Sequence, residues 1–234
     1  MVPQTGLAVT KKRSLDALLV TFVTDGKGDE SRLCSLVEAA LRGGVRAVQL
    51  REPLMRAAQL ARVCERLMIP IRAVDGVLLV NDRCDLAAAG LCDGVQVGHR
   101  SLPVALARRA CGPEALLGAS CHSPLELSNA GDAGADFALL SPVWATSSKP
   151  GLVGLGVERA GPWTREAPLP VLWLGGCSAA RAQEVASLPL AEKPIGIAAI
   201  SAIAEAADPE HASRALVSSW RAALMDRAVR TSRG

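Results

Sequence analysis

The sequence predicts a single-domain α/β protein with a closed (β/α)8 TIM barrel, and three observations carry this prediction. Eight short apolar segments of strand length recur along the chain, and most of them are followed by a segment whose apolar residues have helical spacing. The strand segments are apolar throughout rather than alternating, which is typical of parallel strands covered on both faces. A chain of 234 residues suits eight such units near the small end of this fold's size range.

The first half of the chain gives four of these units. Residues 18–24 (LLVTFVT) are rich in β-formers, and residues 31–42 carry apolar side chains at helical spacing before Gly43 and Gly44 end the helix. The next three units follow in the same order. Their strands are expected at 45–50, 77–80 and 93–97, and their helices at 55–67, 85–89 and 102–110.

The second half continues the alternation with one interruption. Strands are expected at 115–119, 136–140, 169–174 and 195–200, and helices at 124–133, 179–188 and 210–228. The stretch LLSPVWATSSKPGLVGLG (139–156) has hydroxyls, a lysine and glycines but no core-forming pattern, and no helix is assigned between it and the seventh strand. A long irregular segment in a compact domain is usually functional or disordered.

An open, doubly wound sheet is the structural alternative. That fold usually places a glycine-rich GxGxxG turn after its first strand, whereas residues 24–28 read TDGKG. The sequence therefore favours the barrel, which is expected to span residues 15–228. Residues 1–14 and 229–234 are expected to be disordered tails.

Composition argues against several classes of function. The net charge is +3 and aromatic residues make up 3%, without a clustered basic face, so no nucleic-acid partner is expected. No apolar run reaches the length of about 18 residues that a membrane span needs, and the N-terminus lacks the order of a signal peptide. The seven cysteines show no CxxC or Cys/His spacing, so we expect buried thiols in a reducing cytoplasm rather than a zinc site.

Polar residues gather directly after the predicted strands, at the face of a barrel that carries chemistry. Arg51 could bind a phosphate with two hydrogen bonds or pair with Glu52. Asn81 and Asp82 could bind a metal or a polar group, or they could cap the next helix. His122 suits general acid–base work near neutral pH, and a structural histidine is the alternative.

A glycine pair follows the seventh strand. Glycines at a junction between a strand and a helix let backbone N–H groups approach an anion, and barrels often hold phosphate after strands seven and eight. Gly175 and Gly176 could therefore help to bind a phosphate, although a plain tight turn would have the same sequence.

These residues belong to eight segments that together resemble the thiamine phosphate synthase/TenI family of (β/α)8 barrels. The resemblance runs from about residue 18 to residue 203. In the family's order the segments are VQLRE (48–52), LLVNDRCDLA (78–87), DGVQVG (93–98), LGASCHS (117–123), AGADFALLSPVWATSSK (133–149), LGVER (155–159), LPVLWLGG (169–176) and GIAAISAI (196–203).

The resemblance implies an enzyme of thiamine biosynthesis that binds a phosphorylated thiazole. The synthases join this thiazole phosphate to hydroxymethylpyrimidine pyrophosphate and release pyrophosphate, whereas the TenI branch aromatises a thiazole tautomer by moving a proton. A homo-oligomer is also implied. The family's ligand contacts correspond here to Arg51, Asn81, Thr146, Ser148 and Lys149, and its phosphate cradle to Gly175, Gly176, Ile200 and Ser201; Gly156 would let the loop approach the ligand.

Two positions depart from the pattern of the synthases. Pro53 replaces a lysine near the pyrophosphate, and Ser101 replaces the aspartate that would bind magnesium together with Asp82. These losses weaken the stabilisation of a departing pyrophosphate. The sequence therefore favours a TenI-like thiazole tautomerase, without a cofactor and with His122 moving the proton. The alternatives are an active synthase with magnesium at Asp82 and a non-catalytic regulator that binds thiamine phosphate.

Overall fold

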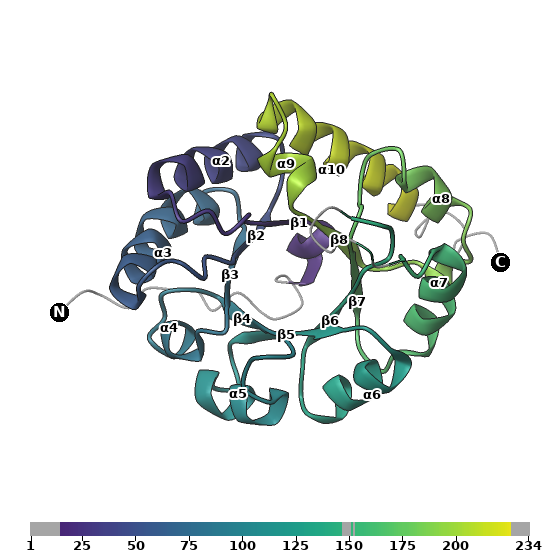
Figure 1. The fold of residues 1–234 in the computed structure, drawn as a ribbon, viewed down its shortest axis with the longest axis horizontal. Helices are drawn as coiled ribbons and strands as arrows, with labels where there is room; N and C mark the ends of the chain where they lie inside the picture. The colour runs from purple at the N-terminus through teal and green to yellow at the C-terminus, as the bar shows by residue number, and fades with distance from the viewer. Residues whose placement is uncertain (1–14, 147–150, 152, 226–234) are drawn as a thin grey trace.

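The computed structural model describes residues 15–146, 151 and 153–225. The expected tails and the expected ligand contacts Ser148 and Lys149 lie outside these residues. Within them the predicted (β/α)8 barrel is confirmed, because parallel strands close into a ring in which β1 pairs with both β2 and β8 (Figure 1). A closed ring excludes the doubly wound sheet, which has two open edges.

The ring contains strands in sequence order, each hydrogen-bonded to the next. Their bounds are β1 (Val20–Val23), β2 (Ala47–Leu50), β3 (Val77–Asn81), β4 (Gly94–Val97), β5 (Leu116–Cys121), β6 (Phe137–Leu140), β7 (Val171–Leu174) and β8 (Gly196–Ala199).

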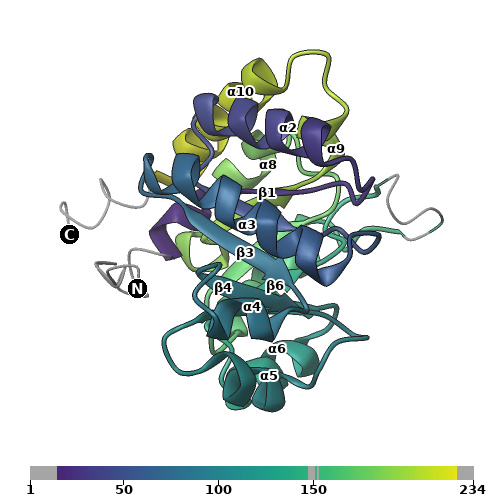
Figure 2. The same ribbon diagram turned by 90° about the vertical axis from the view of Figure 1, so that its left-hand side faces the viewer.

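Helices surround the barrel (Figure 1), and α2 and α10 lie side by side in this outer layer (Figure 2). No helix in the described ranges is both long and apolar enough to cross a membrane. The helices are η1 (Ala17–Leu19), α2 (Glu30–Arg42), α3 (Ala57–Arg72), α4 (Cys84–Ala88), α5 (Val104–Cys111), α6 (Pro124–Asp132), α7 (Val157–Glu166), α8 (Ala182–Ala186), η2 (Leu190–Glu192), α9 (Ser201–Ala204) and α10 (Pro209–Met225).

The strands are apolar throughout because each one separates two cores. A large cluster fills the space between strands and helices and includes Phe22 and Val80. A smaller cluster fills the interior of the barrel and includes their neighbours Val23 and Leu79. Successive residues of a strand therefore enter different cores, which explains the continuous apolar runs in the sequence. The seven cysteines are buried free thiols, as expected.

Several boundaries differ from those expected. Residues 17–19 form η1, so β1 begins at Val20 rather than at residue 18. Helix α3 continues to Arg72 and does not end at residue 67. Pro70 lies within its last turn and does not end the helix. Strand β5 continues to Cys121 instead of residue 119, which places Ser120 within the strand.

The sequence predicts no helix where α7 lies, directly after the irregular stretch that follows β6. Its sequence VERAGPWTRE contains Gly161 and Pro162, both poor helix formers, and its buried residues are only Ala160 and Gly161. These two poor helix formers conceal the helix, although Val157 and Trp163 pack against the core between the strands and the helices. The sequence also predicts neither η2 nor α9, because their lengths of 3 and 4 residues are too short to show any periodicity.

Candidate active site

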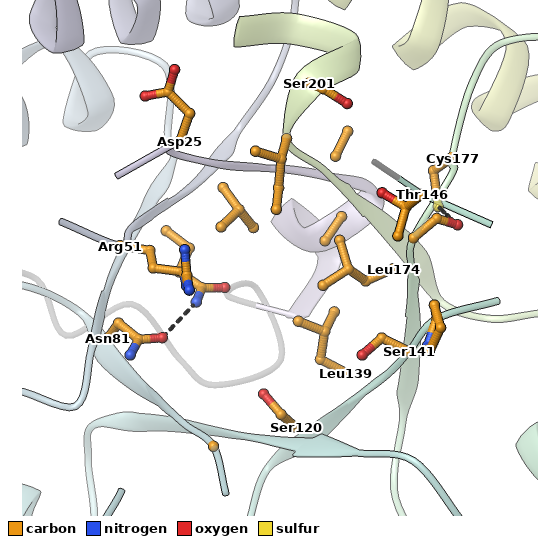
Figure 3. Close-up of a pocket in the computed structure, with 18 of the residues that line it drawn as sticks. Asp25, Arg51, Asn81, Ser120, Leu139, Ser141, Thr146, Leu174, Cys177 and Ser201 are labelled. Carbon is orange, nitrogen blue, oxygen red and sulfur yellow. Dashed lines mark hydrogen bonds between the residues drawn. The ribbon is translucent and has the colours of Figure 1, made fainter. Parts of the chain in front are cut away.

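A cavity of about 610 Å³ opens at the carboxyl ends of the strands. Every strand contributes its last residues or its following loop to the cavity wall, so side chains far apart in sequence meet there. Figure 3 shows Arg51 and Asn81 on one side and Thr146 and Cys177 on the other. The wall contains these expected site residues: Arg51, Asn81, Asp82, His122, Thr146, Gly175, Gly176, Ile200 and Ser201.

Gly156, also expected to contact ligand, is not part of this wall. It caps the N-terminus of α7 with a φ of +72°, and its N–H donates to the carbonyl oxygen of Val143 at 2.9 Å. This left-handed backbone conformation favours glycine at the position without any ligand.

A hydrogen-bonded chain of side chains runs along the wall from β2 to the loop after β4. Gln49 Nε2 donates to Asn81 Oδ1 at 3.1 Å, and Asn81 Nδ2 donates to Asp82 Oδ2 at 2.7 Å. The Ser101 hydroxyl donates to Asp82 Oδ1 and accepts from the N–H of Gly98 at 2.6 Å. Both carboxylate oxygens of Asp82 thus accept hydrogen bonds from neutral groups.

This network, rather than helix capping, accounts for Asn81 and Asp82. Arg83 is the residue that precedes α4, and no side chain caps that helix. Asp82 also has a left-handed backbone conformation with a φ of +64°, which is uncommon for a residue other than glycine. Such strained residues concentrate at functional sites.

The structure does not show the expected alternative pairing of Arg51 with Glu52. Glu52 is buried and its Oε2 accepts from the N–H of Gly28 at 2.9 Å. The backbone N–H of Arg51 donates to Thr24 Oγ1 at 2.9 Å, and the side chain points into the cavity (Figure 3). The guanidinium is therefore placed to form paired hydrogen bonds with an anionic ligand.

His122 follows β5 and has an exposed side chain on the cavity wall. Its Nδ1 lies 2.5 Å from the carbonyl oxygen of Ser141, and its backbone N–H donates to Glu126 Oε2 at 2.5 Å. Because a carbonyl oxygen only accepts hydrogen bonds, Nδ1 carries the proton, and Nε2 of the neutral ring has the free lone pair. Nε2 is therefore the atom that could take up and return a proton.

Gly175 and Gly176 pack tightly against the segment that follows β6. Their φ angles are +101° and +65°, and a Cβ on Gly176 would lie 2.6 Å from the carbonyl oxygen of Ala145. Backbone packing alone therefore requires glycine at these positions. A tight turn, the alternative explanation of the pair, accounts for them without any ligand. The same two residues also border the cavity, next to Ile200 and Ser201 at the start of α9.

The predicted site does not include several other polar residues of the wall, among them Asp25, Gln49, His99, Arg100, Ser120 and Ser141. Gln96 Nε2 donates to Ser120 Oγ at 3.1 Å, which leaves the Ser120 hydroxyl able to donate into the cavity. In the strand register Gln49 pairs with Leu79 and Ser120 with Leu139, both of which point into the barrel. Counting in twos from inward-facing residues would have found both.

Cys177 lines the cavity but is a poor candidate for a nucleophile. Burial raises the pKa of its thiol to about 12, and Sγ lies 3.5 Å from the carbonyl oxygen of Trp173. At neutral pH the side chain is therefore the thiol, whereas the thiolate is the reactive form.

The cavity offers oxygen donors for a metal ion but no complete protein site. Among the described residues, no three His, Cys, Asp or Glu side chains form a group that could hold a metal. Asp82 and Ser101 nevertheless place a carboxylate and a hydroxyl side by side. Magnesium is commonly bound through one or two carboxylates together with substrate phosphates. This donor set fits a magnesium ion that binds together with a phosphorylated ligand.

Known proteins resemble this chain along most of its length. The family model for thiamine monophosphate synthase matches residues 20–203. A thiamine-phosphate synthase of Roseiflexus sp. (strain RS-1) is 37% identical over 212 residues, which cover 90% of this chain and 88% of that protein. A thiamine-phosphate synthase of Natronomonas pharaonis is 37% identical over 201 residues, covering 84% and 92%. The structure of thiamine phosphate pyrophosphorylase from Pyrococcus furiosus gives a TM-score of 0.78 at 29% identity and covers 90% of this chain and 98% of that one.

Proposed function

The chain belongs to the thiamine monophosphate synthase family, and from this premise we propose that it is an active thiamine-phosphate synthase. It joins hydroxymethylpyrimidine diphosphate to a thiazole phosphate and releases diphosphate. The departures at Pro53 and Ser101 favour a tautomerase, but the similar proteins are named as thiamine-phosphate synthases or, for the solved structure, as a thiamine phosphate pyrophosphorylase. The tautomerase therefore becomes the second candidate.

The observation that carries this proposal is the extent of the cavity. One continuous space of about 610 Å³ reaches from Arg51 and Asp82 to Gly176 and Ser201. Polar groups thus face a ligand from two opposite sides, and the volume lies within the range of pockets that hold drug-sized molecules. A reaction between two substrates needs such a space, whereas a tautomerase needs to hold only one thiazole phosphate.

Each side of the cavity suits one phosphorylated substrate. The small residues Gly175 and Gly176, with Ser201 at the start of α9, bind the thiazole phosphate. Arg51, Asn81 and Asp82 face the diphosphate of the pyrimidine. The bond between the methylene carbon and the diphosphate oxygen breaks, and the lone pair of the thiazole nitrogen forms the new C–N bond. The diphosphate leaves with the electrons of the broken bond.

Asp82 and Ser101 would hold magnesium, which when bound neutralises charge on the diphosphate. Their own contribution is to fix the position of that end of the substrate. Arg51 adds a permanent positive charge, which stabilises the anion that leaves. The site offers magnesium one carboxylate, from Asp82, and one neutral hydroxyl, from Ser101. A pair of aspartates would offer two charged ligands.

The thiazole tautomerase remains a candidate because of one contact. Nδ1 of His122 is fixed by the carbonyl oxygen of Ser141, so that Nε2 presents its lone pair. A base oriented in this way can remove and return a proton without a metal. In the synthase reaction the C–N bond forms from a lone pair, and no proton transfer by His122 is required for that step.

The deciding experiment measures diphosphate release from the two substrates, with and without magnesium. We expect turnover by the wild type that magnesium increases, and we expect His122→Ala to retain more than about a tenth of it, because the mutant loses no obligatory proton carrier. A parallel assay follows aromatisation of the thiazole tautomer.

The opposite pattern identifies the tautomerase. In that case no diphosphate is released at any magnesium concentration, the tautomer is aromatised, and His122→Ala slows this reaction by about a hundredfold or more. If the protein binds thiamine phosphate but shows no turnover in either assay, it is the non-catalytic regulator. The cytoplasmic location and the homo-oligomer both stay predictions.

A further inference from the structure

Trp144 does not line the cavity but lies in the segment after β6 that forms part of its wall. The residues two positions before and after it, Pro142 and Thr146, both border the cavity. Trp144 itself is buried, with 6% of its surface exposed. Its position therefore affects how the segment after β6 presents itself to a ligand.

Trp144 is packed directly against the glycine pair. Its backbone N–H donates to the carbonyl oxygen of Gly175 at 3.0 Å. The N–H of the preceding residue, Val143, donates to the carbonyl oxygen of Leu174 at 2.9 Å. A Cβ on Gly176 would lie 2.7 Å from the Cβ of Trp144. A displacement of Trp144 would therefore move the backbone of Gly175 and Gly176.

One side-chain hydrogen bond fixes the indole ring. Trp144 Nε1 donates to Glu184 Oε2 on α8 at 2.9 Å. Arg181 donates to the other carboxylate oxygen at 2.5 Å, and its guanidinium carbon lies 5.7 Å from the centre of the Trp144 ring. A buried indole N–H needs an acceptor, and a charged acceptor gives a stronger bond than a neutral one.

Two other tryptophans pack against the Trp144 ring. The ring centres of Trp173 and Trp220 lie 5.8 and 6.2 Å from that of Trp144, both in edge-to-face contact. The Trp144 ring therefore has two aromatic neighbours, and its N–H has the Glu184 carboxylate as acceptor. This arrangement connects the segment after β6, the glycine pair after β7 and helix α8.

We propose that Trp144 and Glu184 are a pair of positioning residues that hold Gly175 and Gly176 in the conformation that binds the thiazole phosphate. The proposal rests on the proposed function for the identity of this ligand. It predicts that the hydrogen bond between the pair affects the affinity for thiazole phosphate and leaves the affinity for diphosphate, on the opposite side of the cavity, unchanged.

The charge of Glu184 agrees with this role. Burial of its carboxyl pushes the pKa upward, but hydrogen bonds from Arg181 and Trp144 outweigh that effect and leave the pKa below its usual value. The carboxylate is therefore ionised at neutral pH and accepts from the indole under the conditions of an assay.

The test compares Trp144→Phe and Glu184→Leu with Glu184→Gln. Phenylalanine keeps an aromatic ring, smaller than the indole, but lacks the N–H. Leucine cannot accept a hydrogen bond, and glutamine keeps an acceptor oxygen. Titration calorimetry measures the Kd of thiazole phosphate and, separately, of inorganic diphosphate. We expect the first two variants to weaken thiazole phosphate binding about tenfold and glutamine to recover most of it, with diphosphate binding unchanged. The double variant Trp144→Phe/Glu184→Leu should be no weaker than either single variant.

Thr164→Val is the matched control. It removes the acceptor of the neighbouring indole, because Trp173 Nε1 donates to Thr164 Oγ1 on α7 at 2.8 Å, and it keeps the Trp173 ring packed against Trp144. It should lower the melting temperature and leave both affinities unchanged. The proposal is overturned if Trp144→Phe and Glu184→Leu bind thiazole phosphate normally, if both ligands weaken equally, or if Thr164→Val weakens binding as much.

Turnover is measured separately, so the two proposals can fail separately. A wild type that binds thiazole phosphate in the predicted pattern but releases no diphosphate would contradict the synthase reaction and leave the positioning pair supported. A wild type that does not bind thiazole phosphate would overturn the positioning pair.

Discussion

Ser101 shows how one hydroxyl can alter the chemistry of a neighbouring carboxylate. Its hydroxyl donates to Asp82 Oδ1 while Asn81 donates to Oδ2, so Asp82 is stabilised without any cation. A second carboxylate at position 101 would meet Asp82 directly, and two like charges in contact raise each other's energy unless a cation lies between them. We therefore expect the residue at 101 to set how strongly this side of the cavity depends on a bound cation.

We expect Ser101→Asp to strengthen the magnesium dependence. The magnesium concentration that gives half-maximal diphosphate release should fall about tenfold, because a charged ligand is added to the donor set. Without magnesium the variant should be less stable than wild type by about 1 kcal/mol, from the repulsion between the two carboxylates. Activity titrations and thermal unfolding with and without magnesium measure both effects.

Ser101→Asn is the control, because it changes the size of the side chain without adding charge. It should not lower the half-maximal magnesium concentration. An unchanged magnesium response in Ser101→Asp would show that position 101 does not contribute to metal binding.

Lys193 joins the ends of two helices at the level of secondary-structure elements. It is 6% exposed, and its ammonium donates to the carbonyl oxygens of Ala186, at the end of α8, and Ala223, in the last turn of α10, at 3.1 and 2.9 Å. The last carbonyl groups of a helix have no partner within it, and a positive charge at this end is favourable. One buried lysine thus satisfies carbonyl groups of both helices.

Lys193→Met should therefore destabilise the fold without reaching the cavity. Methionine fills similar space, but both carbonyl oxygens lose their donor, so we expect a loss of about 2–3 kcal/mol in the free energy of unfolding. Urea denaturation measures the loss as a lower midpoint. Lys27→Met, at an exposed lysine paired with Asp25 at 3.5 Å, should cost less than about 1 kcal/mol. Equal losses in the two variants would contradict this role for Lys193.

Helices α2 and α7 differ in how clearly the sequence predicts them. Helix α2 has a buried face that includes Leu33, Val37 and Leu41, and its periodicity located it to within one residue at its start. Helix α7 fully buries only Ala160 and Gly161 and contains Pro162, so its sequence gives a much weaker helical signal than that of α2. Periodicity reports only on helices that bury an apolar face.

The whole molecule depends on the closure of the ring between β1 and β8. Val20 pairs with Ile197 and Phe22 with Ala199 in parallel register. At the start of β8, a Cβ on Gly196 would lie 2.1 Å from the carbonyl oxygen of Leu18. The neighbouring atoms are backbone and cannot swing away, so the last strand can approach η1 this closely only with glycine.

Gly196→Ala should weaken the closed barrel as a unit. The added methyl group forces the backbone apart, which we expect to cost about 1–3 kcal/mol of unfolding free energy. Gly98→Ala is the control, because the Cβ there would meet its nearest atom at 3.7 Å, an ordinary contact. Thermal unfolding compares them, and a Gly196→Ala protein as stable as the control would contradict the close approach.

The sequence by itself determined the order of the strands and of most helices, the barrel and the family, since these depend on apolar periodicity and on segments in a fixed order. It also placed Arg51, Asn81, Asp82 and His122 at strand ends, where the structure brings them to one cavity. Only the tertiary structure decided which atoms meet: Ser101 with Asp82, His122 with Ser141, Trp144 with Glu184. The physical reason is that hydrogen bonds between distant residues depend on how loops pack across the barrel mouth, and no local pattern in the sequence records that packing.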